Sequence, residues 1–157
     1  MEILKKYGLA EARKDYAWFD LESFEEINSY IELINNLATI SKNKFAPQNL
    51  TVGNEGWTEN RTYYISEINF ELKEKHYNIR VLCEKWFDFD LILDLNKIMM
   101  QEGFKEQFYP IRTDDQSLII VFGDTFLKEK LASDNVLENT NQLILEKPLN
   151  FNSLKIV

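Results

Sequence analysis

Two runs of residues that alternate between apolar and polar constrain the fold of this chain most. The first run spans 62–72 and the second 77–84, with Glu74, Lys75 and His76 between them. Successive side chains of a β-strand point to opposite faces, so this alternation predicts two strands with one buried face. Because the connection is too short for a parallel crossover, the strands are expected to form an antiparallel hairpin. The buried face would hold Tyr64, Ile68, Phe70, Leu72, Tyr77, Ile79, Val81 and Cys83.

Apolar residues at helical spacing predict two longer helices. The first covers 23–40 and is opened by Ser23 and Glu26, which have the spacing of a capping box. The second begins at Asp88 or Asp90, both N-cap candidates, and ends at Gly103.

A second hairpin is predicted between Gln107 and Phe122, with its turn at 113–116. Asp124 is expected to cap a short helix that runs to Leu131, and 142–147 to form a last strand.

These elements indicate an α+β fold of a single domain over 1–157, in the order α-β-β-α-β-β-α. We expect a mainly antiparallel sheet built from two hairpins, with the helices packed on one face. Residues 42–60 contain Pro47, Gly53 and Gly56 and predict a long loop, and 1–22 are expected to form a peripheral N-terminal segment.

The charge of the chain argues against nucleic acid as its partner. Its 157 residues include 18 Lys and Arg and 26 Asp and Glu, a net charge of −8. Phosphate binding requires clustered basic side chains, and the acidic excess here is spread over both halves of the chain. An acidic domain of this kind favours a basic protein as its partner.

Cysteine content and the N-terminus predict a cytoplasmic protein that does not bind a membrane. Cys83 is the only cysteine, so an intramolecular disulfide is impossible. The N-terminus lacks the pattern of a secretory signal. The longest apolar run, Leu118 to Phe122, is far shorter than the roughly 20 residues that span a bilayer.

No motif for catalysis, cofactor binding or metal binding is found. The carboxylates of Asp88, Asp90 and Asp94 lack the glycine and the third oxygen ligand of a calcium loop, and helix capping explains them better. His76 and Cys83 lie seven residues apart on one predicted strand, too far to form a catalytic couple. A pair of hydrolytic carboxylates stays open, since 26 acidic residues allow many pairs.

Aromatic residues at the ends of the predicted elements indicate a binding surface. Several of them have acidic neighbours, and buried aromatics with polar rims anchor protein interfaces. Core packing at the element ends is the alternative explanation for each. The residues that we predict to contact a partner are Trp57, Trp86, Asp88, Tyr109, Asp114 and Asp115.

The chain resembles the small acidic α+β immunity proteins with which bacteria neutralise toxins. The resemblance lies in the single acidic domain, in Gly56-Trp57, in the junction from Trp86 to Asp90, and in the hairpin with Asp114 and Asp115 at its tip. It implies a stoichiometric inhibitor whose carboxylates meet a basic toxin surface, and it assigns no individual residue.

Two other functions stay open. One is a small-ligand-binding or hydrolytic domain with a pocket between the sheet and 42–60, lined by Trp57 and Tyr64. The other is self-association through the exposed aromatic residues.

Overall fold

The structure, a computed structural model, confirms the α+β class. It describes residues 2–7, 9, 15–113, 115–138 and 145–157. Its elements are α1 (Glu2–Lys5), β1 (Tyr16–Asp20), α2 (Ile27–Ile40), β2 (Gln48–Trp57), β3 (Tyr64–Leu72), β4 (Lys75–Leu82), α3 (Asp90–Gln101), β5 (Gln107–Ile111), β6 (Ser117–Gly123), α4 (Thr125–Ser133) and a short 3-10 helix (Phe151–Ser153).

The strands form two antiparallel sheets of three strands each. Sheet A has the order β1-β6-β5 and sheet B the order β2-β3-β4. Both predicted hairpins are confirmed, β3–β4 in sheet B and β5–β6 in sheet A. Each hairpin gains a third strand from a segment that we had not predicted to be a strand.

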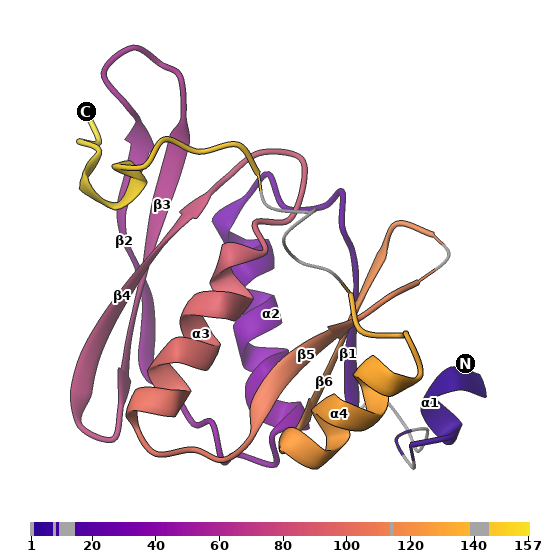
Figure 1. Cartoon of the computed structure of the whole chain (residues 1–157). Helices are drawn as coiled ribbons and strands as arrows, with labels where there is room; N and C mark the ends of the chain where they lie inside the picture. Colours follow the sequence, from indigo (N-terminus) through magenta and orange to yellow (C-terminus); the bar gives the residue numbers. More distant parts are fainter. Residues whose placement is uncertain (1, 8, 10–14, 114, 139–144) are drawn as a thin grey trace.

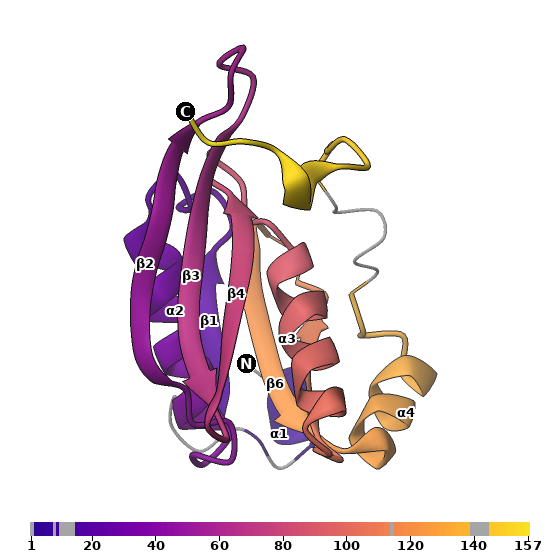
Figure 2. The ribbon, with the colours of Figure 1, turned by 90° about the vertical axis from the view of Figure 1, so that its left-hand side faces the viewer.

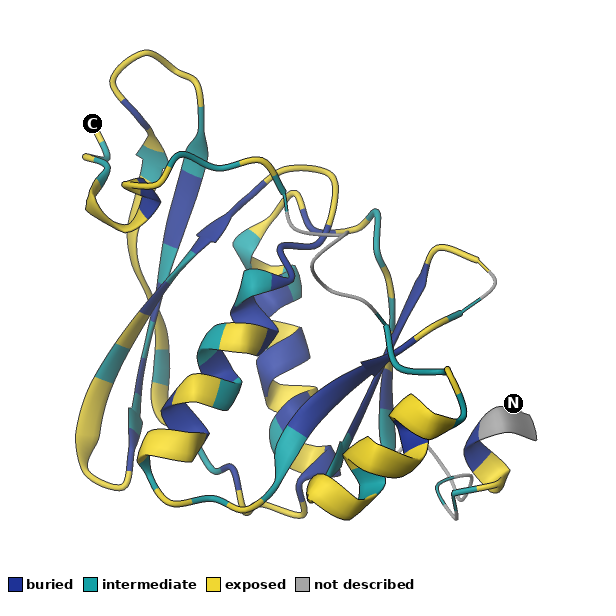
Figure 3. Ribbon diagram, viewed as in Figure 1, coloured by how far each residue is buried: buried dark blue, intermediate teal, exposed yellow. Residues whose placement is uncertain are grey.

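Helices α2 and α3 lie between the two sheets (Figure 1). They share one hydrophobic core with the inner faces of both sheets. A smaller cluster on the other side of sheet A joins Leu4 of α1 and Leu131 of α4 to Tyr109, Ile119 and Val121. Figure 3 shows the buried residues gathered in the middle of the molecule, on α2, α3 and the strands beside them. The helices are thus enclosed by two sheets, where we had expected one sheet with helices on a single face.

The predicted loop at 42–60 contains strand β2, and the predicted peripheral segment at 1–22 contains strand β1. Strand β2 is exposed along most of its length and shifts register twice against β3, so it has no buried face to produce an alternating pattern. Strand β1 is only five residues long and pairs with β6, about a hundred residues away in sequence. Local patterning therefore could not predict either strand.

Helix α2 begins later than predicted, and the capping box is not formed. Its N-cap is Glu26, with no side-chain capping bond. The Ser23 hydroxyl donates to the carbonyl oxygen of Asp20 at 2.7 Å, which removes it from the helix. Asp124 caps α4 as predicted, since its carboxylate accepts from the Leu127 N–H at 3.2 Å.

The C-terminal segment, 145–157, crosses the upper end of sheet B (Figure 2). Phe151 forms a small apolar cluster there with Ile65 and Leu82. Of the predicted last strand, 142–144 lie outside the described residues, and 145–147 do not form a strand. Among the helices that the structure describes, none is both long and apolar enough to cross a membrane.

Candidate functional site

Asp88 is fully buried and forms an ion pair with Lys147 of the C-terminal segment. The Lys147 ammonium lies 2.6 Å from Oδ2 of Asp88 and 2.8 Å from Oδ2 of Asp90. The Asp88 carboxylate also accepts from the backbone N–H groups of Leu82 at 2.9 Å and Asp90 at 3.2 Å. Burial raises the pKa of Asp88 although Lys147 opposes that shift.

The hydroxyl of Tyr30 completes this buried network. It accepts from the backbone N–H of Asp88 at 2.9 Å and donates to the carbonyl oxygen of Leu82 at 3.3 Å. Burial raises the pKa of Tyr30 well above its usual range, so the hydroxyl stays protonated and keeps both roles. Asp88, Lys147 and Tyr30 therefore join α2, β4 and the C-terminal segment, and Asp88 is not presented to a partner.

Tyr109 is likewise not presented to a partner. Tyr109 is only 4% exposed, and its hydroxyl donates to the carbonyl oxygen of Asp124 at 3.4 Å. Asp114 lies outside the described residues. Trp57 and Trp86 remain, with 46% and 42% of their surfaces exposed, and Asp115 is exposed as well.

Hydrogen bonds join three segments, one of which carries Trp86. The Phe24 N–H donates to the carbonyl of Lys85 at 3.3 Å, and the side chain of Gln116 donates to the carboxylates of Asp20 and Glu22 at 3.2 and 3.0 Å. These bonds hold segments 20–26, 84–87 and 115–117 together. We call the surface that they form the acidic end, and its residues are Asp20, Glu22, Glu25, Glu84, Lys85, Trp86 and Asp115.

Asp20 and Glu22 had not been predicted as site residues. They reach the acidic end because β1 pairs with β6, which places Asp20 opposite Ser117. Only a prediction that β1 pairs with β6 could have assigned Asp20 and Glu22 to this surface. Trp57 is the last residue of β2, and the centroid of its indole ring lies 5.3 Å from that of the Tyr64 ring.

Residues 48–57 of the predicted loop are a strand of sheet B, and neither Trp57 nor Tyr64 lines the hollow of about 320 Å³ that Asn49 and Thr51 border together with β3 and β4. The Cys83 and His76 side chains do not meet either. Cys83 is buried beside Ser66, at 3.4 Å between Sγ and Oγ, while His76 is exposed beside Glu71. Burial raises the pKa of the Cys83 thiol to about 11, which disfavours the thiolate that a nucleophile needs.

No protein-family model, curated protein or solved structure matches this chain. In the described part of the chain, no group of three or more His, Cys, Asp or Glu side chains could hold a metal ion.

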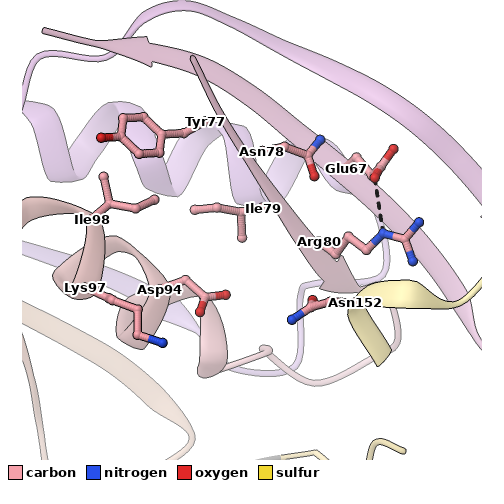
Figure 4. A pocket seen from close by; sticks show the side chains of 9 residues that line it. All are labelled: Glu67, Tyr77, Asn78, Ile79, Arg80, Asp94, Lys97, Ile98 and Asn152. Atoms are coloured by element: carbon pink, nitrogen blue, oxygen red, sulfur yellow. Dashed lines mark hydrogen bonds and ion pairs between the residues drawn. The ribbon is translucent and has the colours of Figure 1, made fainter. Parts of the chain in front are cut away.

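A groove of about 330 Å³ lies between β4 and α3 (Figure 4). Tyr77, Ile79 and Arg80 line it from β4, and Asp94, Lys97 and Ile98 line it from α3. Burial raises the pKa of Asp94 to about 6, and the carboxylates of Asp90 and Asp88 add to that shift. Asp94 is thus a carboxylate that would gain from a cation placed in this groove.

We expect Asp94→Asn to stabilise the protein at neutral pH. The folded pKa of about 6 exceeds the ordinary aspartate pKa of 3.8, so the stability that Asp94 contributes is present in acid and is lost as pH rises through 6. The variant should exceed the wild type by about 1–2 kcal/mol in free energy of unfolding near pH 8 and equal it near pH 4, measured by urea denaturation. A gain of the same size at both pH values would contradict the assignment to Asp94 ionisation.

Proposed function

We propose that this chain is a non-enzymatic protein-binding domain that attaches to a basic partner protein through the acidic end. The observation that carries the proposal is that three segments joined by hydrogen bonds carry the exposed indole of Trp86 and five carboxylates, those of Asp20, Glu22, Glu25, Glu84 and Asp115. Lys85 is the one basic residue in these three segments, and it pairs with Glu22. An exposed tryptophan with a charged rim has the composition of an interface anchor.

The charge of the acidic end favours a particular kind of association. Carboxylates of one sign attract a basic surface at a distance, so encounter is fast and weakens as salt screens the charges. The net charge of −8 adds to the same field. We propose, more narrowly, that the partner is a basic toxin of bacteria and that this domain inhibits it by covering its active site, as the resemblance to immunity proteins implies.

Trp86→Ala should weaken binding of the partner by about 30-fold, which is the usual loss at an interface hot spot. Asp115→Asn should mainly slow association and reduce its dependence on salt. The partner is obtained by capture from a lysate of the source organism on the immobilised wild-type protein, followed by elution with a salt gradient. Affinities of the purified pair are then compared for the wild type and both variants.

A matched control removes one aromatic ring and one carboxylate elsewhere. Phe126 and Glu129 are exposed on α4, away from the acidic end, so Phe126→Ala with Glu129→Gln should leave the affinity unchanged. A captured partner that binds Trp86→Ala and Asp115→Asn as tightly as the wild type would contradict the proposed surface.

A further inference from the structure

The outer edge of β4 carries backbone groups that sheet B does not use. The Cys83 N–H donates to the Tyr64 carbonyl at 2.9 Å, so this residue pair is hydrogen-bonded across the ladder. Hydrogen-bonded pairs alternate along an antiparallel ladder. The register pairs Ile79 with Ile68 and Val81 with Ser66 at hydrogen-bonded positions. Leu82, Arg80 and Asn78 therefore point their N–H and C=O groups away from β3.

The outward groups of Leu82 support this assignment, because both are satisfied from outside the sheet. Its N–H donates to Asp88, and its carbonyl accepts from Tyr30. The outward backbone groups of Asn78 and Arg80 differ from those of Leu82 in this respect. Within the described part of the chain, their backbone N–H and C=O groups have no hydrogen-bond partner. Two donors and two acceptors are thus left open along one stretch of strand.

This open stretch is the β4 side of the groove in Figure 4. Beyond Arg80 along the strand, the Leu82 N–H donates to Asp88, which pairs with Lys147, and at the other end the Tyr77 hydroxyl donates to Glu102. Helix α3 contributes Asp94, Lys97 and Ile98 to the opposite wall. No hydrogen bond or ion pair to the Asp94 carboxylate is present among the described residues.

We infer that this groove binds an extended peptide segment of a partner protein, which adds a strand to the edge of β4 and places a lysine or arginine side chain at Asp94. Open N–H and C=O groups two residues apart match the repeat of a strand, which supplies the same groups at the same spacing. Ile79 and Ile98 offer apolar contact for the neighbouring side chains. The groove shares no residue with the acidic end, so this site goes beyond the proposed function and does not depend on it.

Hydrogen exchange of the free protein tests the open edge first. The amides of Asn78 and Arg80 should exchange much faster than those of Ile79 and Val81, which bond to β3. Equal protection of all four amides would show that the edge is already covered and would overturn the site. A concentration-dependent dimer that protects Asn78 and Arg80 would assign the edge to a second copy of this chain and would also overturn it.

Peptide binding is then measured by NMR with the capped probe acetyl-Thr-Val-Lys-Val-Thr-amide. We expect the amide signals of Asn78 and Arg80 to shift and their exchange to slow. Replacing the probe's lysine by norleucine, or Asp94 by asparagine in the protein, should each weaken binding by about fivefold. N-methylation of alternate amides of the probe should abolish binding, because it removes the donors that the strand needs.

Matched variants separate this site from the acidic end. Asp115→Asn removes the same charge outside the groove and should bind the probe as the wild type does. Trp86→Ala should likewise retain the probe while it loses the captured partner. If the Asn78 and Arg80 signals stay unchanged at millimolar probe, or if Asp94→Asn and Asp115→Asn weaken the probe equally, the groove is not the site that we infer.

Discussion

Replacing Lys147 by methionine should lower the free energy of unfolding by about 3–5 kcal/mol, because it leaves the buried Asp88 carboxylate without its counter-charge. The lysine side chain is only 8% exposed, and Asp88 is not exposed at all. The cost should grow with pH. The folded pKa of Asp88 already lies above the ordinary aspartate pKa of 3.8, so the stability that this group contributes is present in acid and declines as pH rises. Without Lys147 the decline should be steeper.

Urea denaturation of Lys147→Met across the pH range measures this cost. Lys155→Met is the matched control, since Lys155 is exposed in the same segment and its loss should change stability by less than about 0.5 kcal/mol. Adding Asp88→Asn to Lys147→Met should recover part of the loss, because the remaining amide is uncharged. A Lys147→Met protein as stable as the Lys155→Met protein at neutral pH would contradict the buried ion pair.

Phe45→Ala should cost about 3–5 kcal/mol, the usual range for removing a buried phenylalanine. Phe45 is fully buried between the two sheets. Its ring meets Phe70 of sheet B edge to face at 6.2 Å and Phe108 of sheet A at 5.5 Å. The substitution would leave a cavity where the sheets approach, and few neighbours can move to fill it.

Thermal and urea unfolding of three variants test this role. Phe45→Leu should retain more stability than Phe45→Ala, since it restores most of the lost volume. Phe126→Ala is the control, because Phe126 is 75% exposed and its loss should change stability little. A cost below about 1 kcal/mol for Phe45→Ala would show that the sheets do not depend on this contact.

The two hairpins could be predicted because each has one buried face and a short turn. Strands β1 and β2 could not, for different physical reasons. Strand β2 has hardly any buried side chains and therefore no alternation, while β1 is identified by its pairing with β6 and not by its five residues. Whether two hairpins form one sheet or two depends on such distant pairings, which periodicity does not encode.

The candidate site, too, could be predicted from the sequence only in part. Trp57 and Trp86, two of the predicted partner-binding residues, are exposed, and their contact with a partner stays a prediction. Asp88 had the sequence context of an exposed helix cap, and its burial depends on Lys147, 59 residues further along the chain. The open edge of β4 was not predicted, because a strand's sequence pattern does not reveal which of its sides lacks a neighbour.

The separation of Asp88 from Lys147 also has a consequence for synthesis of the chain. The two residues are 59 positions apart, and β6 follows β1 by some hundred residues. At about 5–20 residues per second, a ribosome needs about 3–12 s to proceed from Asp88 to Lys147. During that interval the nascent chain holds an acid that it cannot yet bury with its counter-ion. Sheet B, whose three strands follow one another between 48 and 82, can pair early, whereas sheet A cannot be completed before β6 is made and the Asp88 ion pair cannot form before Lys147 is made.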